Sequence, residues 1–499
     1  MLDPGYYDSL SEQMHKFAQD QLSHWTLAST NFREIRNAPH KAIELNGLIV
    51  DVINIPSRSI STKAKTDEKS LSMRPCFLCP MHRPVEQDFM SFEGAKGKKY
   101  FIQLNPYPIL PEHFVIPTQE HVAQSIWGRY VDMLRLCKRR PGFTIIYNGP
   151  RCGASAPDHF HFQAFPSGLL PLEKSVSAGE NMRFLDSMGD ARIYEYTAYS
   201  KGIFVIRAKT SKSMNRMFYR LLDCVPMPEG DNEPRFNLIS WYKDGEYTSM
   251  VVFRRCHRSW HYFSDDPAEH VAMSPGTVDM GGMFVTIRQE DFLRLDSALL
   301  NEIIADVTMS EQEHEAVVAR LTRRQPVLEI PVLRCKELEF EMLSYGAGRR
   351  KAKFKDGQVE YGGEKFDELY FEAKNPSTMF AEPSFVLYSG PDCSGYGGKE
   401  AKAYAGSMKV SVTDSMLEVT NVIGLEDFVY SKLSACAHDM EVEDIQSEAV
   451  SLRKTVLDGS ACMVDYGLPC VSAEQAKEQI RINRAEARIK WAIDATWDM

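Results

Sequence analysis

The residue types best suited to chemistry are concentrated in one short segment, Asp158-His159-Phe160-His161-Phe162-Gln163. Polar and aromatic residues alternate along it without a break, which is the period of two expected of a β-strand. His159, His161 and Gln163 would then share one face, and the two phenylalanines would pack on the other. Histidine is the side chain most suited to proton transfer, nucleophilic attack and metal binding near neutral pH. The alternative is a half-buried surface strand that happens to carry histidines.

Upstream of this segment, Cys76 and Cys79 are separated by two residues. That gap lets two thiolates reach one tetrahedral ion, and zinc would need two further ligands. A redox-active pair or two buried thiols are the alternatives. The chain has 11 cysteines with irregular spacing. An odd number without a pattern does not indicate a disulfide framework, so reduced thiols are expected.

A basic cluster follows the strand-like segment 250–253 and comprises Arg254, Arg255, His257 and Arg258. In a chain of net charge −10, these residues could bind a phosphate group, bidentately where arginine is involved. A solvated, charged strand end explains the same residues equally well.

The elements that would position these residues are of mixed type. The segment 143–147 is rich in β-forming residues and is bounded by Pro141-Gly142 and Asn148-Gly149, which indicates a strand between two turns. Before it, apolar residues recur at helical spacing. They are Val122, Ile126, Tyr130, Met133 and Leu134.

The clearest domain boundary lies near residues 323–331. Before it, Ser310 and Glu313 form the capping box that starts a helix, and after it the chain reads as strands and turns up to about Val422. We therefore expect a first domain over 1–325 and a smaller, mostly β domain over 330–471. A terminal helix is expected over 472–499, where Glu, Lys, Arg and Ala dominate.

Composition limits the function classes. Hydrophobic residues make up 43% of the chain and charged residues 25%, as in ordinary globular proteins. The net charge of −10 provides no general attraction to nucleic acid or to an anionic membrane, so neither is expected as a partner. Residues 1–26 lack the apolar core of a signal peptide, and no segment approaches eighteen uncharged apolar residues. A cytoplasmic location is expected.

Taken in order, the motifs resemble the histidine-triad superfamily. The segments that carry the resemblance are Cys76-x-x-Cys79, Asn105-Pro106-Tyr107-Pro108, His113-Phe114-Val115-Ile116-Pro117, His121, Asn148-Gly149 and His159-x-His161-x-Gln163. Glutamine in the third place resembles the transferase branch, which includes galactose-1-phosphate uridylyltransferase, diadenosine tetraphosphate phosphorylase and GDP-hexose phosphorylase. Hydrolases of the superfamily usually carry a third histidine there. The resemblance implies an α+β fold with a HIT-like antiparallel sheet and packed helices.

The same resemblance implies the roles of the site residues. His161 would attack an α-phosphorus to form a covalent nucleotidyl-histidine, and Gln163 would donate a hydrogen bond to a non-bridging phosphate oxygen. A structural zinc ion would be held by the four residues Cys76, Cys79, His121 and His159. Further phosphate contacts would come from Asn148, Gly149 and Ser155, for which a plain turn is the alternative, and from Arg254 and Arg258.

The implied substrate is a nucleotide sugar or a dinucleoside polyphosphate, with phosphate or a sugar 1-phosphate as acceptor. The base is not identified, and a homodimer is left open.

From residue 332 onward, the chain resembles a second family, the sporulation stage II protein D family, whose active members are lytic transglycosylases. The segments involved are 336–340, 366–371, 424–428 and 448–453. The glutamate that such enzymes use as general acid is replaced near its expected place by Cys436, so we expect a degenerate, non-catalytic domain. The alternative function is a cell-wall protein that binds or cuts glycan through this domain, but no export signal is visible.

Overall fold

The computed structural model describes residues 4–59, 68–228, 230–322, 326–343, 348–373, 384–388, 401–434, 436–437, 439–457, 468–470, 489 and 492–493. The chain divides into two compact units. The first comprises residues 1–217 and 235–322, and the second comprises residues 218–234 and 323–499. Residues 218–234 thus cluster with the second unit, an association that the sequence did not indicate. All the candidate site residues of the nucleotidyl-transfer prediction lie in the first unit.

The first unit is built on a ten-stranded sheet in which all neighbouring strands are antiparallel. In spatial order the strands are β3 (Met90–Glu93), β4 (Lys99–Leu104), β5 (Phe114–Pro117), β7 (His161–Pro166), β6 (Phe143–Asn148), β11 (Phe236–Lys243), β12 (Glu246–Phe253), β10 (Ile203–Ala208), β9 (Ala191–Tyr196) and β8 (Met182–Met188). A small second sheet has the order β1 (His40–Leu45), β2 (Leu48–Asn54) and β13 (Met283–Thr286).

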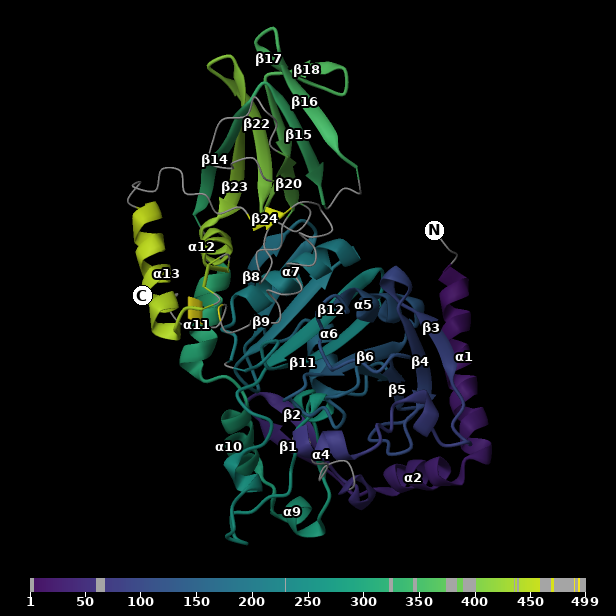
Figure 1. Ribbon diagram of the computed structural model, residues 1–499. Coiled ribbons are helices and arrows are strands. Elements are labelled where there is room, and N and C mark those ends of the chain that lie inside the picture. Colours follow the sequence, from purple (N-terminus) through teal and green to yellow (C-terminus); the bar gives the residue numbers. More distant parts are fainter. Residues whose placement is uncertain are drawn as a thin grey trace. The chain divides into compact units, whose positions relative to one another are not determined.

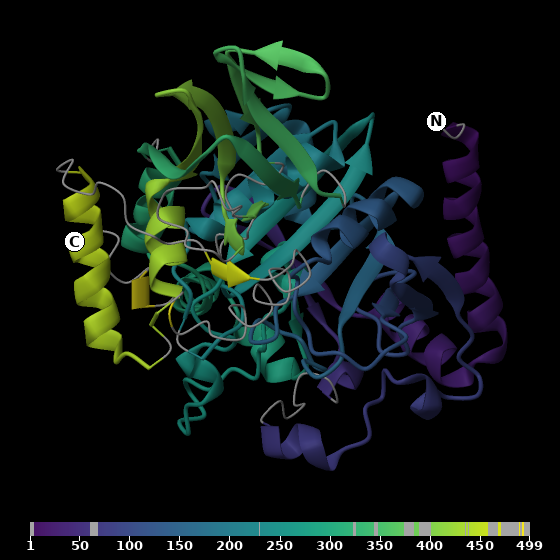
Figure 2. The same cartoon turned by 45° about the horizontal axis from the view of Figure 1, so that its top comes forward.

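Helices surround these sheets, and α1 flanks the edge formed by β3 and β4 in both ribbon views (Figures 1 and 2). The helices are α1 (Pro4–His24), α2 (Thr26–Asn37), α4 (Glu68–Met73), α5 (Tyr130–Arg139), α6 (Pro171–Ala178), α7 (Ser211–Asp223), α8 (Thr277–Met280), α9 (Gln289–Arg294), α10 (Ser297–Val307) and α11 (Glu311–Thr322). Single 3-10 turns are η1 (Pro56–Arg58), η2 (Pro80–His82), η3 (Ala95–Gly97) and η4 (Trp260–Tyr262). The predicted α+β fold class is confirmed.

Strand β7 is fixed by aromatic packing behind the histidines. Phe160 and Phe162 are fully buried, and their ring centroids lie 4.8 Å apart. Tyr147 of β6 stacks on Phe160 at 5.9 Å, and Tyr100 of β4 stacks on Phe162 at 6.1 Å. This aromatic layer explains why the chain alternates polar and aromatic residues here.

Two local expectations need correction. The strand was expected from residue 158, but its hydrogen-bonded part begins only at His161. His159 precedes it in a turn, where its N–H donates to the carbonyl of Ala156. The apolar residues at helical spacing from Val122 predict a helix that begins there, but α5 starts only at Tyr130. Gly128, at φ +66°, is in the left-handed region just before it, which is incompatible with an uninterrupted helix.

The second unit is mostly β. One sheet has the order β14 (Val327–Cys335), β23 (Met416–Gly424), β22 (Ser407–Thr413) and β19 (Glu368–Phe371). The other has the order β18 (Glu364–Phe366), β17 (Gln358–Tyr361), β16 (Arg350–Lys355), β15 (Glu337–Met342), β20 (Phe385–Tyr388), β21 (Ala401–Tyr404) and β24 (Leu468–Cys470). Two helices follow the first sheet, α12 (Leu425–Ser434) and α13 (Val442–Leu457). The terminal helix expected over 472–499 lies outside the described residues, apart from residues 489, 492 and 493.

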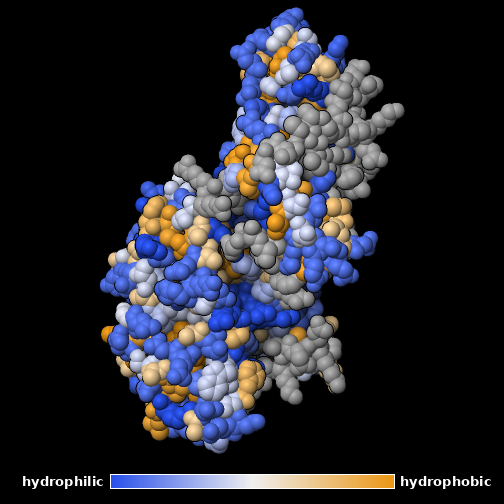
Figure 3. Space-filling model, turned by 90° about the vertical axis from the view of Figure 1, so that its left-hand side faces the viewer, coloured by the Kyte–Doolittle hydropathy of each residue, from blue (hydrophilic) through white to orange (hydrophobic). Residues whose placement is uncertain are grey.

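Among the described residues, no helix has the length and apolar character that a membrane span requires. On the face drawn in Figure 3, the described hydrophobic residues form small separate groups among hydrophilic ones.

Candidate functional site

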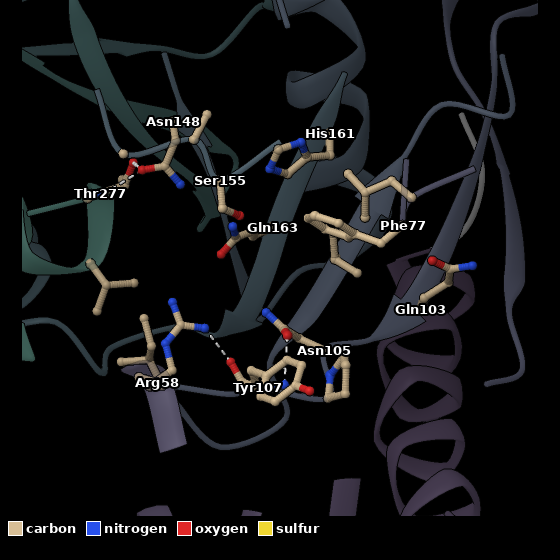
Figure 4. A pocket seen from close by; sticks show the side chains of 18 of the residues that line it. Arg58, Phe77, Gln103, Asn105, Tyr107, Asn148, Ser155, His161, Gln163 and Thr277 are labelled. Atoms are coloured by element: carbon tan, nitrogen blue, oxygen red, sulfur yellow. Dashed lines mark hydrogen bonds between the residues drawn. The ribbon is translucent and has the colours of Figure 1, made fainter. Parts of the chain in front are cut away.

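A cavity of about 440 Å³ in the first unit is lined by both predicted catalytic side chains, His161 and Gln163 (Figure 4). Both project from β7, which lies between β5 and β6 in the large sheet. The other lining residues come from segments far apart in the sequence. They are Trp25, Leu27, Arg58, Phe77, Leu78, His82, Pro84, Gln87, Gln103, Asn105, Pro106, Tyr107, Ile109, Val115, Asn148, Gly153, Ala154, Ser155, His257, Arg258, Ser274, Gly276, Thr277, Val278 and Asp279.

The ring of His161 is oriented by the backbone. Its Nδ1 atom lies 2.9 Å from the carbonyl oxygen of His159, and because a carbonyl only accepts, Nδ1 must carry the hydrogen. Nε2 of the neutral ring then keeps its lone pair. The side chain is 4% exposed, and burial lowers its pKa to about 4. A neutral imidazole with a lone pair at a cavity is the form of histidine that acts as a nucleophile.

A buried glutamine fixes the backbone around the histidine. The N–H of His161 donates to Oε1 of Gln124 at 2.8 Å, and Nε2 of Gln124 donates to the carbonyls of His161 (3.1 Å) and Asn148 (2.9 Å). The pairing of β6 with β7 runs only from Phe143 to Ile146, so Asn148 and His161 do not pair directly. The side-chain amide of Gln124 therefore links the two strands at the position where they form no backbone hydrogen bonds with each other.

The carboxamide of Gln163 is held by a neutral histidine. The N–H of Ile109 donates to Nδ1 of His113 at 3.1 Å, so the ring hydrogen is on Nε2. This Nε2–H donates to Oε1 of Gln163 at 2.8 Å. Burial lowers the pKa of His113 to about 3, which keeps the ring neutral. With its oxygen occupied, Gln163 presents its NH₂ group as the donor for a ligand.

Asn148, at the end of β6, is oriented in the same way. Its Oδ1 accepts from the N–H of Thr277 at 2.8 Å and from Nδ2 of Asn237 at 3.2 Å. Its NH₂ group is therefore left for the cavity. The turn facing it needs glycine, because a Cβ on Gly153 (φ +99°) would lie 2.6 Å from the Cα of Gly276. Two amide groups thus face the space beside the His161 ring, as Figure 4 shows.

The structure brings Ser155 and Arg258 to the cavity, but not Gly149 or Arg254. A Cβ on Gly149 would lie 2.8 Å from the carbonyl oxygen of Phe236, so this glycine is needed for close packing. Arg254 is 4% exposed, and its guanidinium donates to Oδ1 of Asn237 and to four backbone carbonyls. These carbonyls belong to Val307, Pro275, Cys256 and His257. Arg254 thus supports the residue that orients Asn148.

Charged residues that the sequence analysis missed also line the cavity. Arg58 donates from Nη1 to the carbonyl of Tyr107 at 2.6 Å, and burial lowers its pKa only to about 10, so it is a cation at neutral pH. Asp279 accepts from the N–H groups of Gly276 and Val285, while burial raises its pKa to about 6. No local motif marks Arg58, because only the tertiary fold brings η1 to the cavity.

The four predicted metal ligands come together beside the cavity. One ligand atom from each of Cys76, Cys79, His121 and His159 lies within 4.8 Å of all the others. Nδ1 of His159 is 3.3 Å from Sγ of Cys76 and 3.6 Å from Sγ of Cys79, and Nδ1 of His121 is 3.3 Å from Sγ of Cys79. Bond lengths of ~2.3 Å to sulfur and ~2.0 Å to nitrogen separate S and N by about 3.5 Å around a tetrahedral ion.

The surroundings of this group also suit a metal. Nε2 of His159 lies 2.8 Å from the carbonyl of Thr118 and must donate to it, which leaves Nδ1 as the ligand atom. Cys76 and Cys79 are free thiols. Burial raises the pKa of Cys76 to about 11, so without a metal this thiol would stay protonated. The group could therefore hold a metal ion, which would replace that proton.

Comparisons with known proteins cover mainly the first unit. Residues 17–166 match a family described as domain of unknown function (DUF4922), and residues 175–324 match the GDPGP1-like C-terminal domain. A galactose-1-phosphate uridylyltransferase of Halalkalibacterium halodurans is 26% identical over 194 residues, which cover 34% of this chain and 35% of the relative. The chain thus spans about a third of the length of that relative.

Two solved structures are also similar. Yeast Ap4A phosphorylase Apa2 in complex with AMP has a TM-score of 0.39 and 17% identity, covering 59% of this chain and 96% of that chain. The same enzyme in complex with Ap4A has a TM-score of 0.39 and 17% identity, covering 60% and 97%. The GDPGP1-like match and the uridylyltransferase relative support the resemblance of the ordered motifs from Cys76 to Gln163 to the transferase branch of the histidine-triad superfamily.

Proposed function

We propose that the first unit catalyses nucleotidyl transfer through a covalent nucleotidyl-histidine on His161. The observation that carries the proposal is the combination at one cavity of a buried neutral imidazole and two oriented amides. Arg58 and Arg258 line the same cavity and would attract an anionic substrate. The substrate class is a nucleotide sugar or a dinucleoside polyphosphate, and the acceptor is phosphate or a sugar 1-phosphate.

In the first step, the Nε2 lone pair of His161 attacks the α-phosphorus and forms a P–N bond. The bond from this phosphorus to the bridging oxygen breaks, and its electron pair leaves with the departing phosphate ester. In the second step, an acceptor oxygen attacks the same phosphorus, the P–N bond breaks, and its electron pair returns to Nε2. Phosphorolysis and transfer to a sugar phosphate differ only in the group that enters second.

The surrounding residues would lower both barriers. The carbonyl of His159 accepts from Nδ1–H and stabilises the positive charge that the ring acquires when phosphorylated. The NH₂ groups of Gln163 and Asn148 would donate to the non-bridging oxygens, where negative charge is concentrated. Because these amides are already oriented before the substrate binds, they need no reorganisation during the reaction.

For the metal group we propose zinc in a structural role. Two thiolates and two imidazoles fill a tetrahedral shell and leave no position for a reacting water. When bound, the ion would supply rigidity rather than acid chemistry. His159 would be both a zinc ligand and the residue whose carbonyl orients His161, so the metal would hold the nucleophile in register. Reduced thiols of this kind suit a cytosolic protein.

The experiment incubates the protein with α-³²P-labelled nucleotide sugars and dinucleoside polyphosphates and measures protein-bound label. A phosphoramidate is labile in acid and stable in base, so this test identifies the linkage. We expect acid-labile label in the wild type and none in His161→Ala. His40→Ala, which alters an exposed histidine on β1 outside the cavity, is the control and should keep the label. Label that persists in His161→Ala would place the nucleophile elsewhere.

None of the residues named in this proposal lies in the second unit, which we still predict to be a non-catalytic domain. A homodimer also remains a prediction.

A further inference from the structure

One side chain in the cavity has no part in the proposed mechanism. Gln103, near the end of β4, is 3% exposed and lines the cavity. Among the described residues, its carboxamide has no hydrogen-bond partner. Its amide atoms are not among the enclosed polar atoms that lack a partner, so they are open to the cavity and available to a ligand. Figure 4 shows Gln103 on the side of the cavity away from Asn148 and Thr277.

The walls near Gln103 are flat and apolar. Val115 is its cross-strand partner on β5, and both side chains border the cavity. Phe77 and Leu78, from the loop between the two cysteines, line the same space. Phe77 is fixed by Arg74, whose guanidinium lies 4.9 Å from the ring centroid and forms an ion pair with Asp158 at 2.8 Å. Apolar walls with one amide suit a heteroaromatic ring.

The neighbours of Gln103 have fixed hydrogen-bonding polarity. Gln87 lines the cavity and donates from Nε2 to the carbonyl of Leu104 at 2.9 Å, which leaves its oxygen as an acceptor. Asn105 accepts from the N–H of Tyr107 at 3.0 Å through Oδ1, which leaves its NH₂ group as a donor. Gln103 itself can offer one donor and one acceptor side by side. Such an edge complements the adjacent donor and acceptor groups of a nucleobase.

We propose that Gln103 is the specificity-determining residue for the nucleobase and binds the pairing edge of the base through one donated and one accepted hydrogen bond. The inference rests on the proposed function, because it requires a nucleotide in this cavity. Every base carries an adjacent donor and acceptor on this edge, but in its own order, and the amide of Gln103, which shares the cavity with the acceptor of Gln87 and the donor of Asn105, favours one order over the others.

The test measures the affinity of the full-length protein for AMP, GMP, CMP and UMP by calorimetry. We expect the wild type to prefer one of them, and Gln103→Leu to lose about 10-fold to 100-fold of that preference, as expected for one bidentate base contact. Leucine keeps the volume and removes both hydrogen bonds. Gln103→Glu, which offers two acceptors, should shift the order of preference towards bases with two adjacent donors. Gln13→Leu, on the exposed face of α1, should match the wild type.

The outcomes separate the two proposals. Base preference that is absent in the wild type, or unchanged in both Gln103 variants, overturns the role of Gln103 while covalent labelling of His161 can still succeed. Conversely, base preference that persists in His161→Ala, together with unaltered labelling there, supports Gln103 and contradicts the nucleophile assignment. No nucleotide binding to the wild type contradicts both.

Discussion

Nε2 of His113 lies 2.8 Å from Oε1 of Gln163, and this single contact determines which end of the glutamine carboxamide faces the cavity. The two amide atoms of glutamine differ little in size, so only hydrogen bonding can select between them. The backbone N–H of Ile109 fixes the tautomer of His113, and His113 in turn fixes Gln163. The direction of the donor that faces the cavity is therefore set by the backbone N–H of Ile109.

Replacing Gln163 by Ala should slow nucleotidylation of His161 by ~10²-fold or more, the usual cost of deleting one oriented donor to a developing charge. Single-turnover labelling with an α-labelled substrate measures this rate. Gln163→Glu should be at least as slow, because a carboxylate repels the phosphate. A Gln163→Ala rate within a few-fold of the wild type would remove the amide from the mechanism.

His113 should make the protein less stable in mild acid. Its pKa is about 3 in the folded state, below the ordinary value of 6.5, so the unfolded chain binds a proton that the folded chain does not. Its stabilising contribution is full above pH ~6.5 and declines as pH falls towards ~3, reaching a loss of about 2 kcal/mol near pH ~5.

The measurement compares thermal midpoints of the wild type and His113→Leu at the two ends of the range from about pH 7 to about pH 5. The wild-type midpoint should fall further on acidification than that of the variant. Equal falls in both proteins would show that His113 is not the group responsible.

The purified protein should hold one zinc per chain, measured by elemental analysis after expression with zinc supplied. Cys76→Ser should reduce zinc content, thermal stability and activity together, since metal binding contributes folding free energy. Cys436→Ser is the matched control, because Cys436 is exposed and lies in the second unit. A wild-type protein free of zinc, with full activity, would rule out the metal assignment.

Gln124→Met should preserve volume in the core but remove the three hydrogen bonds that link His161 and Asn148. We expect slower labelling at saturating substrate with little change in KM, because the nucleophile would be misplaced while the nucleotide contacts stay. Gln124→Glu restores the acceptor for the N–H of His161 but not the donors, so partial recovery is expected. A change confined to KM would contradict a positioning role.

The second unit should not cleave peptidoglycan. Cys436 stands near the place where a carboxylic acid is expected, and a thiol is a weaker acid than a carboxyl group for protonating a glycosidic oxygen. In the structure its Sγ lies just after α12, 3.4 Å from the carbonyl of Lys432 in the last turn of that helix. The assay digests purified glycan with the full-length protein. Cleavage lost on Glu426→Gln but not on Cys436→Ser would show that the acid is Glu426.

The parts of the site that could be predicted from the sequence are those whose residues lie within a few positions of one another along the chain. The alternation around His161 and the two-residue gap between Cys76 and Cys79 reflect local geometry. The structure brings His161 and Gln163 to one cavity and the two cysteines into one group with His121 and His159, although the strand begins only at His161. The basic cluster shows the limit of this approach. The sequence shows that Arg254 and Arg258 are cationic, but only the surrounding carbonyls show that Arg254 points into the protein and not into the cavity.

The residues that the sequence analysis missed reach the cavity through tertiary contacts. Arg58 lies in a 3-10 turn, Gln103 on an otherwise apolar strand and Thr277 at the start of a short helix, and none belongs to a chemically suggestive pattern. A lone glutamine on an apolar strand is the one signal that could have been followed, since β4 buries Gln103 among hydrophobic residues.

The contact of Thr277 with Asn148 joins positions 129 residues apart, and β13 closes the small sheet by pairing in parallel with β2, Met283 opposite Asp51. During synthesis, the ribosome must therefore release most of the first unit before the amide of Asn148 can receive its partner Thr277. The cysteine and histidine ligands emerge earlier, all within residues 76–159. Metal capture can thus precede completion of the cavity, and nucleotide binding can report that folding has finished. A nascent chain cut short before residue 277 would contain all four candidate metal ligands but would lack Thr277, which orients Asn148.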